Sequence, residues 1–276
     1  MSDGPSTSEL AASRPIPKPL VQTAIAAAFA EDLGLAGDVT TDAILAADWS
    51  ARGQIVAREP GVVAGASVAA AAFQYLDPSM TVDLKIVDGS QVEAGAVIVE
   101  LAGNARAMLS AERTALNFFG RMSGIATLTR RFVDAVAGTG AQIVDTRKTT
   151  PGLRAFEKYA VRAGGGMNHR VGLFDAVLIK DNHIALAGGI AQAVTAARQR
   201  AGHMVKIEVE VDTLDQLDQL LALKADAVLL DNMSPEQLAE AVRRIDGRMI
   251  SEASGGVRLD TVRAIAESGV DLIPIG

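Results

Sequence analysis

The sequence predicts an α/β fold in two parts, an N-terminal α/β sandwich followed by an incomplete, TIM-like α/β barrel. Short strand-like runs punctuated by glycines fill the chain as far as Gly103. From Glu112 onward, apolar runs alternate with helical stretches, and a polar side chain stands where each apolar run ends. Buried parallel strands that alternate with amphipathic helices are typical of a β/α sheet or barrel.

The first part mixes one short helix with short strands. Residues 20–33 have a helical pattern, and the runs ARGQIVAR, GVVAG, TVDLKIVDGS and AVIVELAG follow. Such runs favour antiparallel strands, and we place the sandwich domain at residues 20–121. Residues 1–19 are polar, rich in Pro and Ser, and lack the apolar centre of a signal peptide. We therefore expect a disordered lead and a cytoplasmic protein.

The second part, residues 122–276, predicts the catalytic barrel domain. A long helical segment at 112–137 precedes AQIVDT, and the apolar runs AVLIK, VKIEVEV, AVLLD, MISEAS and DLIPIG follow. Convergence of strand ends on one face is how β/α barrels build active sites. A doubly wound sheet also places sites at strand ends, but concentrates them near one switch point. Every strand-like run here ends in a candidate site residue, which favours the barrel. The small number of strands makes the barrel incomplete.

Composition limits the class of protein and of ligand. There is no cysteine, which excludes disulfides and Cys-based metal sites. No apolar run approaches the length of about 18 residues that a membrane span needs. The chain carries a net charge of −7, yet residues 146–180 hold seven Lys/Arg against two Asp/Glu, a net +5. A local focus of positive charge on an acidic protein suits small carboxylates and phosphates, not nucleic acid.

Basic residues stand at the ends of two strand-like runs. Arg147 and Lys148 follow QIVDT, and Lys180 follows DAVLI. Arg offers a planar fork for a carboxylate, whereas Lys offers a compact charge for phosphate. A solvated surface pair is the plainer interpretation, and the strand-end position argues against it. The run AGGGMNHR adds glycines, which let a ligand approach the backbone, before His169 and Arg170, although a flexible loop with a structural histidine has the same pattern.

Acidic residues end the next two runs. Glu210 and Asp231 could bind sugar hydroxyls or hold Mg²⁺ through water, and capping or salt-bridged acids are the alternative. Strand alternation places Glu208 on the same side as Glu210 but one layer deeper, where we expect a Lys or Arg partner and no functional role. The three histidines have no close His/Cys/Asp grouping in the sequence, so no zinc site is predicted.

Small residues and one arginine complete the candidates. The run EASGGV precedes a helical stretch, so Ser254, Gly255 and Gly256 predict a phosphate cradle at a helix N-terminus. IPIG, which ends at Gly276, predicts the adjacent loop of that cradle. Arg113 falls in the first turn of the helix expected from residue 112, where a cation is unfavourable for the helix dipole. An ordinary exposed Arg, a bound anion and a neighbouring subunit are the alternatives there.

Long motifs of the sequence resemble those of one known family. They run from EDLGLAGDVTTDAI through ERTALNFFGRMSGIAT, DTRKTTPGLR and YAVRAGGGMNHRVGLFDAVLIKDNH to EVEVD, LLDNM and EASGG. Residues 21–276 are identified as a member of the quinolinate phosphoribosyltransferase family (nicotinate-nucleotide pyrophosphorylase, carboxylating). The resemblance implies type II phosphoribosyltransferase architecture. It also implies a homodimer in which the sandwich of one subunit covers the barrel of the other, and leaves a higher oligomer open.

The resemblance implies a role for each matching position. Arg147, His169 and Arg170 resemble the quinolinate-carboxylate site, which Arg113 enters from the neighbouring subunit, and Lys148 and Lys180 resemble the pair between quinolinate and phosphoribosyl pyrophosphate. The implied substrate-binding set is Arg113, Thr146, Arg147, Lys148, His169, Arg170, Lys180, Glu210, Asp231, Ser254, Gly255, Gly256 and Gly276. Lys148, Glu210 and Asp231 are the implied catalytic residues, and the two acids are the implied Mg²⁺ residues, acting through water and substrate.

The implied enzyme is a decarboxylating pentosyltransferase of de novo NAD biosynthesis. It joins quinolinate to phosphoribosyl pyrophosphate, with Mg²⁺, and yields nicotinate mononucleotide, pyrophosphate and CO₂. Pro274 stands where the family usually has Ser, and family chains continue beyond Gly276. One rival is a paralogue of this fold from molybdenum operons with another substrate. The other is a carrier domain, because residues 87–103 resemble a biotinyl/lipoyl hammerhead, but the hairpin tip EAG carries no Lys.

Overall fold

The computed structural model describes residues 14–223 and 225–276, and the chain divides into two compact units. Unit 1 runs to Arg130 and also includes residues 150–165, whereas unit 2 comprises residues 131–149 and 166–276. The chain thus leaves unit 2 after Thr149 and re-enters it at Gly166, a path that a single cut after residue 121 does not describe. Residues 1–13 of the expected lead lie outside the described residues, and helix α2 already begins at Lys18.

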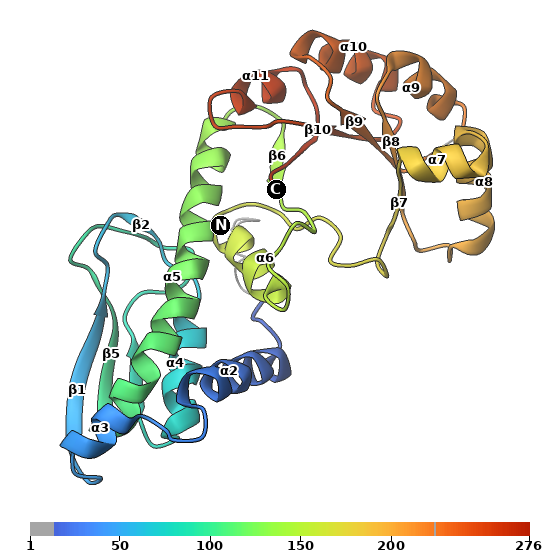
Figure 1. The fold of residues 1–276 in the computed structure, drawn as a ribbon. Helices are drawn as coiled ribbons and strands as arrows, with labels where there is room; N and C mark the ends of the chain where they lie inside the picture. The colour runs from blue at the N-terminus through green and yellow to red at the C-terminus, as the bar shows by residue number, and fades with distance from the viewer. Residues whose placement is uncertain (1–13, 224) are drawn as a thin grey trace, which may run out of the picture. The chain divides into compact units, whose positions relative to one another are not determined.

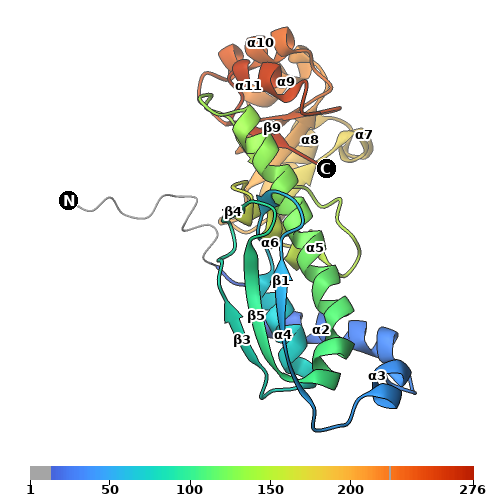
Figure 2. The ribbon, with the colours of Figure 1, turned by 90° about the vertical axis from the view of Figure 1, so that its left-hand side faces the viewer.

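Unit 1 contains a small antiparallel sheet with helices packed against it. The three-stranded sheet has the order β1-β5-β3, and β2 pairs with β4 in a separate antiparallel pair (Figures 1 and 2). The strands are β1 (Ser50–Val56), β2 (Gly61–Val62), β3 (Thr81–Leu84), β4 (Gln91–Val92) and β5 (Val97–Asn104). The helices are α2 (Lys18–Leu33), α3 (Val39–Ile44), α4 (Ala66–Leu76), α5 (Ala105–Ala135, whose end belongs to unit 2) and α6 (Arg154–Ala163).

The core of unit 1 follows from the alternation of apolar residues in these elements. Phe29 of α2 and Phe73 of α4 pack in one buried cluster with Ile55 of β1 and with Val99 and Leu101 of β5. Side chains of a strand point alternately to its two faces, so Val99 and Leu101 share one face of the sheet. The helices cover this face, as expected for an α/β sandwich.

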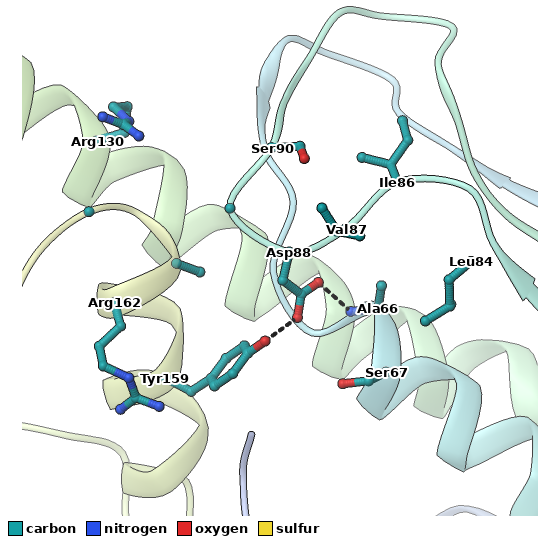
Figure 3. Close-up of a pocket in the computed structure, with 13 residues that line it drawn as sticks. Ala66, Ser67, Leu84, Ile86, Val87, Asp88, Ser90, Arg130, Tyr159 and Arg162 are labelled. Carbon is teal, nitrogen blue, oxygen red and sulfur yellow. Dashed lines mark hydrogen bonds between the residues drawn. The ribbon is translucent and has the colours of Figure 1, made fainter. Parts of the chain in front are cut away.

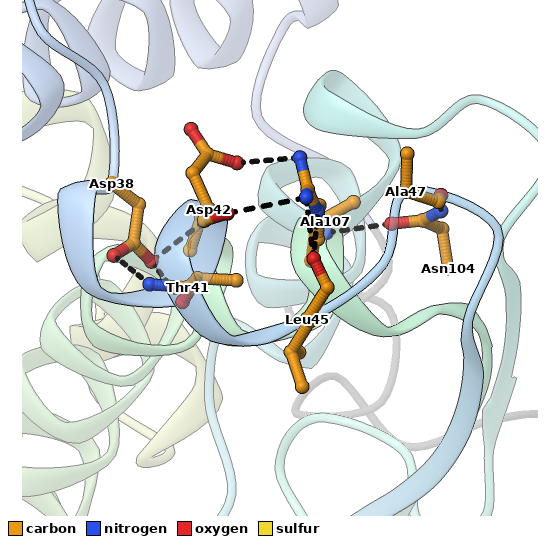
Figure 4. Close-up of polar contacts among 9 residues, drawn as sticks. Asp38, Thr41, Asp42, Leu45, Ala47, Asn104 and Ala107 are labelled. Carbon is orange, nitrogen blue, oxygen red and sulfur yellow. Dashed lines mark hydrogen bonds and ion pairs between the residues drawn. The ribbon is translucent and has the colours of Figure 1, made fainter.

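Polar contacts attach the short helix α3 to the start of α5 (Figure 4). Asp38 caps α3 by accepting hydrogen bonds from the Thr41 N–H at 2.9 Å and from its hydroxyl at 2.5 Å. Arg106 of α5 lies 3.0 Å from the Asp42 carboxylate. Asn104 donates to the Ala47 carbonyl at 2.7 Å, and its side-chain oxygen accepts from the Ala107 N–H at 3.0 Å. The motif around residues 38–42 is therefore a structural connection to the helix that carries Arg113.

Unit 2 is a six-stranded parallel sheet in the order β6-β11-β10-β9-β8-β7 (Figure 1). Its strands are β6 (Gln142–Val144), β7 (Val177–Ile179), β8 (Ile207–Val211), β9 (Ala227–Asp231), β10 (Ile250–Ser254) and β11 (Leu272–Pro274). Its helices are α7 (Asp181–Ala187), α8 (Ile190–Arg200), α9 (Leu214–Leu221), α10 (Pro235–Ile245) and α11 (Val262–Glu267). The predicted alternation of strand and helix is confirmed, and β6 and β7 form the two edges of the incomplete barrel.

One face of this sheet is apolar and packs against the helices. Val209 of β8, Leu230 of β9 and Ala253 of β10 join a buried cluster with Leu217 of α9 and Leu238 of α10. The residues next to them in each strand must point to the opposite, inner face. No helix among the described residues is long and apolar enough to cross a membrane.

Candidate active site

Most of the predicted site residues lie at one edge of the parallel sheet in unit 2. Each follows or ends a different strand, and the carboxyl ends of parallel strands meet at the same edge. Arg147 and Lys148 follow β6, Lys180 follows β7, Glu210 lies near the end of β8, Asp231 and Ser254 end β9 and β10, and Gly276 follows β11. The predicted convergence of strand ends is therefore present in the fold.

The two arginines expected to bind carboxylates lie within electrostatic range of each other. Burial lowers the pKa of the Arg170 guanidinium, and the positive charge of Arg147 lowers it further. The Arg170 guanidinium donates to the Ala176 carbonyl at 3.1 Å. Asp175 closes the same loop by accepting from the Val171 N–H at 2.6 Å. Two like charges at a partly buried site are chemically suited to a ligand with negative charge on more than one group.

Lys148 is placed by a tight turn and lies against the end of the last strand. Its N–H donates to the hydroxyl of Thr146 at 2.9 Å. A Cβ built on Gly276 would lie 3.0 Å from Cδ of Lys148 and 3.4 Å from its ammonium nitrogen. Gly276 and the Lys148 side chain thus lie against each other, and a larger residue at position 276 would make the lysine shift.

Lys180 and Glu210 form an ion pair between neighbouring strands. The ammonium lies 2.5 Å from Oε2 of Glu210, and the Lys180 N–H donates to Nδ1 of His183 at 2.9 Å. Asp231 accepts a hydrogen bond from the side-chain amide of Asn232 at 2.7 Å. Each acid has one oxygen engaged by a neighbour, which leaves a partly exposed carboxylate with a second oxygen. Carboxylate oxygens suit Mg²⁺, and these two acids fit an ion held mainly by water and substrate.

The residues expected to form a phosphate cradle lie on a loop and not at a helix N-terminus. Gly255 and Gly256 have φ of 103° and 59°, a region that favours glycine. Asn232, itself at φ 54°, donates its N–H to the Ser254 carbonyl at 2.9 Å. Helix α11 begins only at Val262, so the expectation that the glycines lead directly into a helix is wrong. Backbone N–H groups of the loop are the donors available to a phosphate.

Two buried acids lie against His169, a grouping that the sequence analysis did not predict. Nε2 of His169 lies 3.1 Å from Oε2 of Glu208 and 3.3 Å from Oε2 of Glu252. The two acids are 7% and 2% exposed. The expectation that Glu208 pairs with a Lys or Arg is wrong, because its partner is the imidazole. Asp145 accepts hydrogen bonds from the His169 N–H at 2.8 Å and from the side chain of Asn168 at 2.6 Å.

This group suits a proton better than a metal ion. Hydrogen bonds to Glu208 and then to Glu252 raise the pKa of His169 to about 10. Burial raises the pKa of Glu252, with the charge of Glu208 adding to the effect. Nε2 and one oxygen of each acid lie within 4.8 Å of one another, but a metal ion would need that nitrogen without its proton. We therefore place a proton on Nε2, between the carboxylates.

Two expectations about the basic residues change in the structure. Helix α5 begins at Ala105, so Arg113 does not lie in the first turn, and the argument from the helix dipole fails there. Arg113 is exposed and belongs to unit 1. The basic stretch is also divided, because Lys158 and Arg162 lie on α6 in unit 1, where Lys158 is buried and Arg162 stacks on Tyr159. Only part of the local positive charge therefore belongs to the barrel edge.

Unit 1 has a cavity of its own, of about 600 Å³ (Figure 3). Asp88 in its wall accepts hydrogen bonds from the Gly65 N–H at 2.9 Å, the Ala66 N–H at 3.1 Å and the Tyr159 hydroxyl at 2.6 Å. Burial, with the hydrogen bond to Asp88, raises the pKa of Tyr159. The Asp88 carboxylate thus caps α4, and none of the predicted site residues lines this cavity.

The fold and the site together define a class: an α/β enzyme with an anion-binding site at the carboxyl edge of an incomplete parallel barrel. Residues 38–123 and 125–276 match the N-terminal and C-terminal domain models of quinolinate phosphoribosyl transferase. The chain therefore belongs to the quinolinate phosphoribosyltransferase family. The two matches adjoin near residue 124.

Individual relatives agree with this membership. The chain is 46% identical to the probable nicotinate-nucleotide pyrophosphorylase [carboxylating] of Bacillus subtilis, over 90% of this chain and 85% of the relative. It is also 46% identical to the nicotinate-nucleotide pyrophosphorylase [carboxylating] of Mycobacterium leprae, over 90% and 89%. The solved nicotinate-nucleotide pyrophosphorylase of Francisella tularensis superposes with a TM-score of 0.91 at 42% identity, covering 95% of this chain and 92% of that one. NadC of Streptococcus pyogenes gives 0.92 at 38% identity, covering 96% and 93%.

Proposed function

We propose that this protein is a quinolinate phosphoribosyltransferase of NAD biosynthesis. The reaction joins quinolinate to phosphoribosyl pyrophosphate and yields nicotinate mononucleotide, pyrophosphate and CO₂. The observation that carries the proposal is the family match along both domains, together with carboxylating pyrophosphorylases as relatives over most of their length. The basic residues gathered at one edge of the barrel supply what a dianion and a polyanion need in order to bind side by side.

Quinolinate binds, in this proposal, at the paired arginines. Arg147 and Arg170 face its carboxylates, with His169 beside them and Arg113 contributed by the neighbouring subunit of a homodimer. Support comes from the electrostatic proximity of Arg147 and Arg170 and from the position of Arg113 on an exposed helical surface. A dicarboxylate relieves the repulsion between two guanidiniums, whereas a monocarboxylate leaves one of them unsatisfied.

Phosphoribosyl pyrophosphate binds across the neighbouring strand ends. Thr146, Lys148 and Lys180 line its boundary with quinolinate, Glu210 and Asp231 face the ribose, and the loop of Ser254, Gly255 and Gly256, with Gly276, takes the 5′-phosphate. Mg²⁺, when bound near the two acids, supplies charge stabilisation for the departing pyrophosphate. Support comes from the Lys180–Glu210 pair, from the contact of Lys148 with Gly276, and from the left-handed backbone of the glycines.

The reaction requires the protein chiefly to bind the two substrates and to orient them. Loss of pyrophosphate leaves an oxocarbenium-like centre, which Glu210 or Asp231 stabilises near the ribose, while Lys148 stabilises the charge of the leaving group. The ring nitrogen then becomes quaternary. Its positive charge stabilises the carbanion left at C2 when the 2-carboxylate departs as CO₂, and C2 then takes up a proton from water. Positioning of the two rings is therefore the main contribution of the site.

The decisive experiment compares two substrates that differ by one carboxylate. With phosphoribosyl pyrophosphate and Mg²⁺, labelled quinolinate should release CO₂, and omission of Mg²⁺ should abolish the release. Nicotinate should not be used, because one partly buried guanidinium would lose its partner at a cost of ~2–5 kcal/mol. Equal turnover of nicotinate and quinolinate would contradict the proposal and favour a paralogue with another substrate. A cytoplasmic location stays a prediction, since some plant relatives are named as chloroplastic or mitochondrial.

A further inference from the structure

The inner face of the barrel holds two carboxylates directly below the candidate active site. The Cα register pairs Glu252 with Leu229, and Leu229 with Glu210, so Glu252 lies at the level of Glu210. Glu208 lies two residues earlier in β8, one layer deeper. Val209 and Ala253 pack against the outer helices, so both acids point to the inner face. Both reach the same atom, Nε2 of His169.

This arrangement is costly for the fold. Two carboxylates compete for one imidazole N–H, and Oε2 of Glu252, on a side chain only 2% exposed, lies 3.3 Å from this shared nitrogen without a well-formed hydrogen bond. Buried charges of this kind are rarely the most stable choice, and apolar residues of similar volume often stabilise a fold more. Costly buried groups tend to persist where function needs them, and in this group Glu252 lies at the level of Glu210 while Glu208 lies one layer deeper.

We propose that Glu208 and Glu252 are positioning residues for quinolinate binding, which act by clamping the His169 ring and, through it, the main chain that presents Arg170. The inference rests on the proposed function. The carboxylates hold the ring at Nε2, and its other nitrogen, Nδ1, accepts the Arg170 N–H at 2.8 Å. Asp145 holds the preceding peptide, through the His169 N–H. The ring thus links the floor of the barrel to the Arg170 backbone.

The clamp has a physical task, which is to keep two like charges together before substrate arrives. Arg147 and Arg170 repel each other, so a loose Arg170 loop would separate them. The negative charge of Glu208 acts on Arg170 in the opposite sense and favours its charged form, as does Asp175. Glu208 therefore contributes twice, once through the imidazole and once as a counter-charge beneath the guanidinium. When the two arginines are already in place, less free energy is lost to reorganisation as a dicarboxylate binds.

Conservative variants separate this role from a structural one. Glu208→Gln and Glu252→Gln keep the shape of each side chain and remove its charge. We expect each to raise KM for quinolinate by about tenfold or more, the loss expected for a hydrogen bond to a charged group. KM for phosphoribosyl pyrophosphate should change less than twofold, and the melting temperature of Glu252→Gln should stay equal or rise. Glu240→Gln, which removes a charge from a surface pair on α10, is the matched control and should change none of these values.

A spectroscopic measurement reports the clamp without any turnover. The chain has three histidines, and His183 and His203 are both exposed, so ¹⁵N-histidine labelling gives few signals to assign. The His169 Nε2–H should be protected from solvent exchange in the wild type, and the protection should be lost in the Glu208→Gln/Glu252→Gln double variant.

The outcomes distinguish the inference from the proposed function. Three outcomes would each overturn the clamp. The first is a wild-type KM for quinolinate in both variants, and the second is a parallel rise in both KM values with a lower melting temperature. The third is a stoichiometric transition metal in the purified protein. A wild-type protein that shows the protected proton but neither binds nor converts quinolinate would instead overturn the proposed function. A tenfold loss confined to quinolinate, together with loss of the protected proton, supports both.

Discussion

The Lys180 ammonium and the Glu210 carboxylate, 2.5 Å apart, join the ends of β7 and β8. Neither side chain is deeply placed, since Lys180 is 47% exposed and Glu210 13%. An ion pair with one partner in solvent contributes only about 0.2–1 kcal/mol to folding. The pair is therefore better explained by the charge balance of the site than by stability.

A double-mutant cycle tests that explanation. Lys180→Ala, Glu210→Gln and the double variant should show a coupling energy in urea unfolding of about 1 kcal/mol or less. Lys180→Ala alone should lower turnover by roughly 10²-fold, because a donor aimed at developing negative charge is lost. A coupling of several kcal/mol, with activity intact, would show that the pair is structural.

Arg147 and Lys148, although adjacent, should affect different kinetic constants. Lys148→Ala should reduce kcat by roughly 10²–10³, as loss of one preorganised donor does. Arg147→Ala should mainly raise KM for quinolinate, because its fork binds a carboxylate in the ground state as well. Steady-state kinetics in both substrates separates the two effects. Wild-type kcat in Lys148→Ala, with only a higher KM, would remove Lys148 from the chemical step.

The two glycines of the cradle offer a matched pair of substitutions. A Cβ on Gly255 would collide with the Asn232 side chain and lie 2.9 Å from its backbone N, whereas a Cβ on Gly256 meets nothing within 4 Å. Both residues have positive φ, which costs alanine about 1–2 kcal/mol at each position. Gly255→Ala should therefore raise KM for phosphoribosyl pyrophosphate more than Gly256→Ala does. Equal effects of the two would mean that the contact with Asn232 does not shape the phosphate loop.

Subunit mixing tests whether Arg113 acts in the active site of the neighbouring subunit. Arg113→Ala and Lys148→Ala should each be nearly inactive, and a heterodimer of the two would hold one intact site and one with both lesions. Random reassociation gives half heterodimers, so roughly a quarter of wild-type activity should return. Arg147→Ala mixed with Lys148→Ala is the control, since both lesions lie in the barrel and no intact site can form. No recovery after proven exchange would remove Arg113 from a shared site.

The pKa of His169 predicts how stability depends on pH. Its folded pKa of about 10 lies above the ordinary 6.5, so the protonated ring adds to the free energy of unfolding. This contribution is fully present below pH 6.5 and is lost as pH rises towards 10. The unfolding free energy of wild type minus that of His169→Gln should thus fall between pH 6 and pH 10. His203→Gln, on an exposed side chain, is the control. The predicted fall would mean that a proton on Nδ1 displaces the Arg170 N–H, because a charged ring cannot accept it. A constant difference would mean that this hydrogen bond keeps the ring neutral, with its one proton on Nε2.

Residues at strand ends could be predicted from the sequence, whereas their partners could not. Period-two alternation and the position of Lys180 or Asp231 at the end of an apolar run are local signals. The pairing of Glu208 with His169 joins residues 39 positions apart and depends on the register of β8, β9 and β10. An acid in every second position of IEVEV was the available signal, because a buried strand rarely carries an acid on its inner face without a partner.

The assignment of residues 150–165 to unit 1 could not be predicted from the sequence either. Helix α6 has a strongly apolar face, with Phe156 and Tyr159 buried, and any βα pattern would assign it to the barrel. It belongs to unit 1 instead, where Tyr159 bonds Asp88. Local periodicity identifies a buried face but not the surface that buries it, which is a tertiary choice. The start of α5 was misplaced for a similar reason, because β5 runs into the helix without a break at Asn104.

The position of β11 between β6 and β10 has a consequence for how the protein matures on the ribosome. Synthesis proceeds from the N-terminus, so β6 emerges long before the neighbour that will pair with it. Until residues 272–274 appear, β6 has no neighbouring strand in the sheet, and the contact between Lys148 and Gly276 does not exist. A nascent chain that stops before β11 should therefore be inactive, even though the other five strands of its barrel have already been made.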